Sequence, residues 1–461
     1  MTRSMARLAL AAVLVLLPAG AGAQQQPLTL ETALARAERQ AYGNRIARAQ
    51  AEAAEAPALA ALQGVLPTVR FEGGYLRTTD PIGAFGTTLR QRAIAPEDFD
   101  PARLNYPSAV SNYQAGVVLE QPLFNADAHL GRTAARRAAD AADASAAWAS
   151  VGTRVDVIRA YYGAVLAAEK TRTLEAAYRA ARGHVAQAEK VMRAGLATRS
   201  DALLAEVKAG EVEAELIGAR DEAELARRQL AVLLGTPEDT AFALPVALPS
   251  VASVRALLAA EPAPPNTERR ADVRAARLGA SAAGADVKRA FSLYLPRING
   301  FARYDWNSAN RLYGGDENWT VGVMASWTPF AGASEWAERR GAGGRAEAAR
   351  AGLAAAAANA SLEIERAAGA RRVALARLDI AARAVRQSAE ANRIVTRKYE
   401  GGLATVLELL DAAAVKTQSE LQLAHTRYTG VVAAAEERRA RGYDPAEVAG
   451  LVQHELVGIE P

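Results

Sequence analysis

The same short segment occurs twice in the chain, and this duplication constrains its fold more than any other feature. Residues 193–201 read RAGLATRSD and residues 400–408 read EGGLATVLE. Two more pairs of segments recur in the same order: AGVVLEQPLF with VGVMASWTPF, and VLPTVRFEGGYLR with YLPRINGFARYDW. Such self-similarity is typical of tandem structural repeats. We expect a first repeat over 24–240, a Pro-rich linker over 241–267 and a second repeat over 268–461.

The N-terminus has the pattern of a secretory signal peptide. Arg3 and Arg7 precede an apolar run from Leu8 to Leu17, and residues 21–23 (Ala-Gly-Ala) resemble a cleavage site. The apolar run is too short to span a bilayer. We therefore expect residues 1–23 to be removed and the mature chain to lie outside the cytoplasm.

The composition excludes several kinds of site. The chain has no cysteine, so it has no disulfide, no thiolate metal site and no acylated N-terminal cysteine. Its formal net charge is only +4, and basic and acidic residues are interleaved, so no nucleic-acid partner is expected. No helix-length stretch is apolar enough to cross a membrane.

Four segments alternate apolar and polar residues, as strands with two different faces do. In the fourth, Val321 and Val323 alternate with Thr320 and Gly322, and aromatic residues lie near the ends. This pattern is typical of strands that face lipid on one side and water on the other; the alternative is a half-buried soluble hairpin. The strands are expected near 67–79, 112–123, 296–307 and 318–329.

Four strands cannot close a barrel by themselves. An open sheet edge in lipid leaves backbone groups unpaired at a cost of several kcal/mol each. We therefore expect several copies of the chain to contribute strands to one closed barrel, although the pattern does not give the number of copies.

The remaining sequence predicts long helices. Residues 127–194 and 334–401 contain no proline, and a second helix of about 35 residues follows each GLAT segment. Apolar and small residues recur there at alternating steps of four and three, which predicts coiled-coil seams. A solvated bundle within one monomer is the alternative. The seam residues are Leu203, Val207, Gly210, Ala214 and Ile217 in the first repeat and Leu410, Ala414, Thr417, Leu421 and Ala424 in the second.

Each GLAT segment has the signals of a tight turn between two helices. Glycine ends a helix in the left-handed conformation, and the following leucine packs back on it. Thr198 with Asp201, and Thr405 with Glu408, have the spacing of a capping box. The residues expected to build these helical tips are Gly195, Leu196, Thr198, Gly402, Leu403 and Thr405.

In this order and in duplicate, these motifs make the chain resemble the TolC family of outer-membrane efflux proteins (outer-membrane factors). The matching residues are Leu66-Pro67, Leu295-Pro296, the QPLF and WTPF junctions, both GLAT tips with Asp201 and Glu408, and Tyr399. The resemblance implies a mainly helical homotrimer with a 12-stranded transmembrane β-barrel in the outer membrane of a Gram-negative bacterium. It also implies a coiled-coil tunnel of 12 helices that crosses the periplasm.

The resemblance further implies a passive duct. An inner-membrane transporter would supply the energy, and a periplasmic adaptor (membrane fusion protein) would contact the helical tips and complete a tripartite pump. Multidrug or small-molecule efflux is the favoured function, and a type I protein secretion duct is the alternative. A periplasmic coiled-coil adaptor is the rival from another class, but it would need one hairpin inside β-rich flanks.

In the family, acidic residues at the positions of Glu408 and Asp411 line the periplasmic aperture. Three copies would form a ring of carboxylates that favours cations and raises some carboxylate pKa values. The alternative is that Glu408 only caps its helix and Asp411 only faces water. Asp201 and Tyr399 are expected to meet across hairpins and hold the opening shut, although Ala404 stands where relatives often have a basic residue.

No catalytic, cofactor or metal-binding constellation stands out in the sequence. None of the lysines follows a glycine as in an ATP-binding loop. We expect a protein that is not an enzyme and has no cofactor. The loop 80–112 is expected to face outside, where it could narrow the outer mouth or bind phage. The histidines, which are isolated and expected to be exposed on helices, are His129, His184, His425 and His454.

Overall fold

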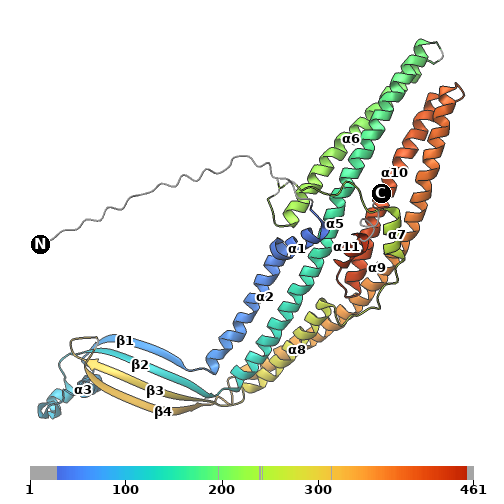
Figure 1. Ribbon diagram of the computed structural model, residues 1–461. Helices are drawn as coiled ribbons and strands as arrows, with labels where there is room; N and C mark the ends of the chain where they lie inside the picture. Colours follow the sequence, from blue (N-terminus) through green and yellow to red (C-terminus); the bar gives the residue numbers. More distant parts are fainter. Residues whose placement is uncertain (1–27, 196, 238–239, 241, 313, 454–461) are drawn as a thin grey trace, which may run out of the picture.

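The computed structural model describes residues 28–195, 197–237, 240, 242–312 and 314–453. The expected signal peptide lies outside the described residues. The protein is elongated, with a four-stranded sheet at one end and two long helical hairpins pointing away from it (Figure 1). This arrangement confirms the predicted fold class, which is mainly helical with four strands per chain.

The strands form one antiparallel sheet in the order β1-β2-β3-β4. Their bounds are Thr68–Thr78 (β1), Val110–Phe124 (β2), Arg297–Ser308 (β3) and Asp316–Ser326 (β4). Each repeat supplies one hairpin, and β2 pairs with β3 to join the two repeats. The outer strands β1 and β4 each have one edge that no strand of the described chain covers.

The pairing register places the alternating residues on two distinct faces. Val69 lies opposite Leu119, and Ala302 lies opposite Val321, so the apolar residues share one face. Nothing in the described chain covers this face: Phe71 is 79% exposed and Trp319 is 74% exposed. Such exposed apolar surface needs another apolar phase or partner to cover it.

The opposite face of the sheet is polar and its charges pair with each other. Arg303 lies 2.7 Å from Asp305 and 3.5 Å from Glu72, and Arg70 lies 3.6 Å from Glu72. Two of these pairs lie within one strand, and the Arg303–Glu72 pair reaches from β3 to β1 across β2. The sheet therefore has one apolar and one charged, water-compatible surface.

Two long helices carry the chain away from the sheet. Helix α5 (Ala126–Arg193) turns back into α6 (Arg199–Leu233), and α9 (Ser334–Glu400) turns back into α10 (Val406–Ala440). Shorter helices α2 (Tyr42–Ala60) and α8 (Ala271–Ser292) pack beside α5 nearer the sheet, where α8 also contacts α9 (Figure 1). No helix of the described ranges is both long and apolar enough to cross a membrane.

The seam predicted in the first repeat is not the one that the chain uses internally. Leu203, Val207 and Ile217 are 50–64% exposed. The buried face of α6 is an alanine-rich row that begins one residue earlier, because small side chains let α6 approach α5 closely. That row is Ala202, Ala205, Ala209, Leu216, Ala219 and Ala223. In α10, Leu410 and Ala424 of the predicted seam are buried as expected.

The main hydrophobic core lies at the middle of the bundle, where α1 (Leu30–Gln40), α7 (Val251–Ala259) and α11 (Glu447–Gln453) pack on the long helices. The linker region is fastened there through Glu169, which accepts from the backbone N–H of Leu248 at 3.0 Å and forms a part-buried ion pair with Arg427. Removing one partner of such a pair would leave the other charge poorly compensated.

Candidate functional site

Both helical tips contain complete capping boxes. In the second, the Glu408 N–H donates to Thr405 Oγ1 at 3.2 Å, and the Thr405 N–H donates to Glu408 Oε2 at 2.7 Å. In the first, the Asp201 N–H donates to Thr198 Oγ1 at 3.2 Å, and the Thr198 N–H donates to Asp201 Oδ2 at 2.9 Å. Each box provides acceptors for two backbone N–H groups at the helix N-terminus that have no partner within the helix. The capping prediction is confirmed in both repeats.

The glycine of each tip has the conformation that the turn requires. Gly195 has φ +77° and Gly402 has φ +72°, which residues with a Cβ rarely adopt. Leu403 N–H then donates to the carbonyl of Lys398 at 2.7 Å and closes the end of α9. Leu403 itself is 82% exposed, so its predicted contact back onto the helix is wrong. Leu196 lies outside the described residues.

Capping also sets the charge of the two carboxyl groups. Hydrogen bonds from the Thr198 backbone and side chain lower the pKa of Asp201, and those from Thr405 lower the pKa of Glu408. These bonds favour the ionised form because the carboxylate accepts them. In one chain both groups therefore carry a full negative charge at neutral pH, and the raised pKa values expected for a ring concern an assembly of several copies.

The two hairpins pack against each other close to their tips. Val406 and Leu410 of α10 are buried against Val185 of α5 and an alanine surface of α5 and α6. Tyr399 packs on the same cluster, named here the tip core. Its alanines, whose small side chains let the helices approach, are Ala181, Ala188, Ala205 and Ala209.

Tyr399 and Asp201 come together in this tip core, within one chain. Burial raises the pKa of Tyr399, and the negative charge of Asp201 raises it further. The Tyr399 hydroxyl is buried without a hydrogen-bond partner among the described residues. A buried hydroxyl normally has a partner. The sequence suggested that Asp201 and Tyr399 meet. Within one chain the charge of Asp201 acts on Tyr399, but no hydrogen bond joins the two side chains.

A cavity of about 520 Å³ lies beside the tip core, between α5, α6 and α10. Asp411, Lys208 and His184 are among its lining residues. Glu211 raises the pKa of Lys208 through a 2.8 Å ion pair, and the charge of Asp411 adds to this effect. The charge of Asp411 on α10 thus acts on Lys208 of the other hairpin, 203 positions away in the chain, without a direct ion pair between the two side chains.

His184 corrects one expectation from the sequence. It is half-buried on the cavity wall, and burial lowers its pKa. His129 and His425 are exposed as expected, and His454 lies outside the described residues. Within the described residues, no group of three or more histidine, aspartate or glutamate side chains could hold a metal ion.

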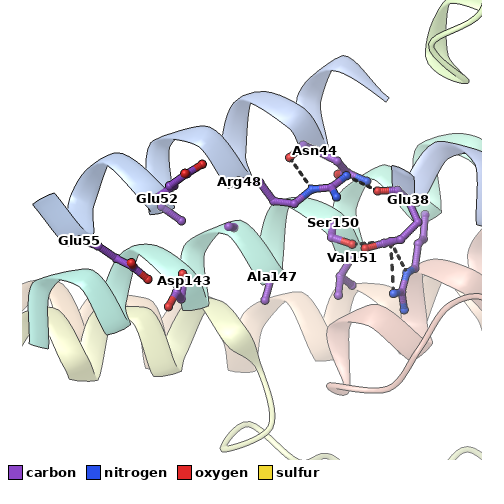
Figure 2. Close-up of a pocket in the computed structure, with 12 residues that line it drawn as sticks. Glu38, Asn44, Arg48, Glu52, Glu55, Asp143, Ala147, Ser150 and Val151 are labelled. Carbon is purple, nitrogen blue, oxygen red and sulfur yellow. Dashed lines mark hydrogen bonds and ion pairs between the residues drawn. The ribbon is translucent and has the colours of Figure 1, made fainter. Parts of the chain in front are cut away.

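A second pocket, of about 510 Å³, lies where α1 and α2 meet α5. Figure 2 shows its polar wall: Ser150 donates to Glu38 at 2.7 Å, and Arg48 reaches back to its own helix at the Asn44 carbonyl. Arg154 pairs with the same Glu38 at 3.3 Å. The Glu38 bonds join α1 to α5, and Thr153 of α5 donates to Asn44 of α2 at 2.8 Å, so polar contacts hold the three helices together around this pocket.

The comparisons with known proteins agree with this geometry. A model of the outer membrane efflux protein family matches residues 45–236 and 266–441. The chain is similar in structure to the outer membrane protein VceC of Vibrio cholerae, with a TM-score of 0.72, 20% identity, and 90% of this chain and 96% of that chain covered. No curated protein matches significantly.

Two further solved structures show the same fold. A membrane protein of Pseudomonas aeruginosa has a TM-score of 0.76 at 22% identity, covering 89% of this chain and 92% of that chain. The MtrE outer membrane channel of Neisseria gonorrhoeae has a TM-score of 0.71 at 19% identity, covering 90% and 89%. The family match spans most of both repeats and confirms the resemblance predicted from the sequence. This chain belongs to the outer membrane efflux protein family.

Proposed function

We propose that the protein is a homotrimeric outer-membrane duct that conducts exported small molecules passively to the cell exterior. Three copies contribute four strands each to a single 12-stranded barrel, and their helices form a periplasmic tunnel. The observation that carries this proposal is a sheet with an uncovered apolar face and two unpaired edges. In lipid such a sheet is stable only when closed.

The sheet edges support closure between copies. Strand direction alternates across the sheet, so β1 and β4 run in opposite directions. When two copies lie side by side, β1 of one copy can therefore pair with β4 of the next as an antiparallel strand. The apolar face then points to lipid, and the face with Arg303 and Asp305 points to a water-filled interior. Each copy would bury the backbone groups that a single chain leaves open.

The helices support the same assembly. The exposed row of α6, with Leu203 and Ile217, lies at one side of the bundle. On α9, Val373, Ile380 and Ile394 are 41–58% exposed and recur at multiples of seven residues, the spacing of a coiled-coil seam. Two unpartnered apolar rows on different helices suit contacts between neighbouring copies in a ring.

We propose that the helical tips contact a periplasmic adaptor that links the duct to an inner-membrane transporter. Leu403 is strongly exposed at the second tip, and exposed apolar residues on a polar tip are typical of a protein contact. Gly195, Thr198, Gly402 and Thr405 hold the tip conformation, and Leu196 is the counterpart of Leu403. The sequence has no nucleotide-binding loop, so the transporter supplies the energy.

Asp201, Tyr399, Glu408 and Asp411 are the residues proposed to form the periplasmic aperture. Cations of the same chain act on both acids: the charge of Lys398 lowers the pKa of Glu408, and the charge of Asp411 raises the pKa of Lys208. We infer that both carboxylates contribute to the field at the opening. Glu408→Gln with Asp411→Asn is expected to reduce cation selectivity in planar bilayers; unchanged selectivity of this variant would contradict the ring.

The membrane assembly is tested by a matched pair of adjacent positions. Val321 is 67% exposed on the apolar face, and Thr320 is exposed on the polar face. An arginine on the lipid face costs about 2–4 kcal/mol near the bilayer centre. We expect Val321→Arg to reduce trimers in the outer-membrane fraction and Thr320→Arg to leave them intact. Purification of the parent as a detergent-free, soluble monomer would overturn the proposal.

Small-molecule efflux and type I protein secretion would use the same fold, so the transported cargo distinguishes between them. Secretion of a folded or unfolded protein partner through the channel, rather than efflux of small compounds, would favour the type I secretion reading. The two functions are separated by the drug susceptibility of a strain that lacks this gene. If reintroducing the parent gene restores drug resistance, the result supports small-molecule efflux. A monomeric periplasmic adaptor, the third candidate, would also change drug susceptibility when deleted, because an adaptor is part of the pump, but it would fractionate without the outer membrane.

A further inference from the structure

The connection between β1 and β2 is folded rather than open. It lies at the end of the sheet farthest from the long helices, and α3 stands beyond the strands (Figure 1). It consists of α3 (Pro81–Arg90), η2 (Pro96–Phe99) and α4 (Pro101–Asn105). Asp80 caps α3 by accepting from the Gly83 N–H at 2.6 Å, and the Phe85 and Phe99 rings meet edge to face at 5.9 Å. The segment is thus a small ordered unit.

Hydrogen bonds fasten this unit to the polar face of the sheet. Gln91 Nε2 donates to the side-chain oxygen of Asn112 and to the carbonyl of Ser111, both at 2.9 Å. From the other side, Asn318 Nδ2 donates to the Arg90 carbonyl at 3.3 Å. The residues after α3 therefore reach from the start of β2 to the start of β4, across the end of β3.

Burial identifies the covered face. Asn112 is 3% exposed and Asn307 is 2% exposed, and Asn112 donates to Asn307 at 2.9 Å. The register puts Asn307, Asn318 and Asp305 on the same side of the sheet, opposite to Trp319. The unit thus lies over the polar side, because asparagines facing open water would not be nearly inaccessible.

Arg92 shows that the attachment holds the chain in an unfavourable conformation. Its φ is +51°, although it has a Cβ, and its guanidinium donates to the Glu317 carbonyl at 2.9 Å. Such a backbone conformation persists only where surrounding contacts maintain it. Gln91, Arg92 and Asn318 thus act together as a fastening between the unit and two strands.

We propose that residues 81–108 form an inward-folded cover over the outer mouth of the channel and limit the size of what passes. This inference rests on the proposed function, because the polar face must line the interior of a closed barrel. Three copies would bring three covers toward one axis. Release of the bonds from Gln91, Arg92 and Asn318 would let each cover swing away and widen the mouth.

The cover is tested by thiol labelling from outside intact cells. The chain has no cysteine, so Thr320→Cys introduces a single thiol on the polar face below the cover. Arg311→Cys, in the exposed connection between β3 and β4, is the matched control at the same end of the sheet. Each is labelled with a small maleimide and with a maleimide that carries a bulky polymer. The backgrounds are the parent, a triple variant (Gln91→Ala, Arg92→Ala and Asn318→Ala), and a chain in which a short Gly-Ser linker replaces 81–108.

With the parent cover we expect the small reagent to label both positions and the bulky reagent to label only Arg311→Cys. Releasing or shortening the cover should restore bulky labelling at Thr320→Cys. Equal bulky labelling of both positions in the parent overturns the cover but leaves the channel intact. If even the small reagent fails at Thr320→Cys in the shortened chain while labelling Arg311→Cys, the polar face is not a lumen, and the proposed function itself fails.

Discussion

Asn112 donates its side-chain amide to the Oδ1 atom of Asn307 at 2.9 Å, and both side chains are almost completely buried. This bond joins the first repeat to the second on the polar face of the sheet. Asn112 also accepts from Gln91, so the three amides form one small network. Buried amides of this kind stabilise a structure only while every member has its partners.

Asn307→Ala is therefore expected to destabilise the protein by about 1–3 kcal/mol, because it leaves the Asn112 donor buried without a partner. Asn112→Ala with Asn307→Ala should cost less than the sum of the single variants, since the two side chains interact directly. Denaturant unfolding in detergent measures these changes. Asn105→Ala, at an exposed side chain of α4, is the control, and strict additivity would argue against the network.

Thr405→Ala should remove the second N-cap and cost about 1 kcal/mol of local stability. Glu408 N–H, which donates to the Thr405 hydroxyl, should then exchange its proton faster. Hydrogen exchange of tip peptides provides the measurement, and Thr405→Ser should retain protection because it keeps the hydroxyl. Unchanged hydrogen exchange at residues 403–409 in Thr405→Ala would show that the cap contributes no measurable stability to the tip.

Both helical tips should loosen in acid. The pKa values of Asp201 and Glu408 are lowered in the folded tips, so the frayed state binds protons more readily. Their stabilisation is present above the ordinary carboxyl pKa and is lost as pH falls through the lowered folded values. Tip hydrogen exchange, corrected for the intrinsic rate, should show this loss. Asp201→Asn with Glu408→Gln should flatten the dependence; an identical pH profile in that variant would refute it.

Gly430→Ala is expected to destabilise the protein by about 1–3 kcal/mol, because the added methyl group would overpack the contact between α10 and α7. A Cβ at this position would lie 2.8 Å from Val254 Cγ1 and 3.2 Å from Leu258 Cδ1, both on α7. Gly183→Ala is the matched control, because no atom lies within 4 Å of its added Cβ. That change should stabilise α5 by about 0.5–1 kcal/mol. Thermal unfolding of both variants compares the two sites, and a loss of equal size at Gly183 would exclude the steric explanation.

Several features followed from the sequence because their signals are local. The alternation around Val321 places apolar and polar residues on opposite faces whatever the strand pairs with, since successive side chains of a strand point to opposite sides. The capping boxes at Thr198 and Thr405 are complete within four residues. Such elements need no knowledge of the rest of the chain.

The coiled-coil seam of α6 shows where local pattern was insufficient. Leu203 and Ala202 begin two rows with similar spacing, and the larger side chains favoured the row that α6 does not pack against α5. The chain packs the alanine row internally because α5 must approach closely, which leaves Leu203 exposed. Choosing between two apolar rows depends on the shape of the partner helix, which the spacing does not carry.

The sequence alone indicated the duplicated plan, because the two copies can be compared directly, and it indicated the two-faced strands and the capped tips, because each is encoded in residues only a few positions apart. Tertiary structure decided which row of α6 packs on α5, that His184 lies half-buried on a cavity wall, and that the 80–112 segment folds back over the polar face. Those relationships join residues that are distant in the chain. Their energies arise only after the helices and strands have packed, so no local pattern encodes them.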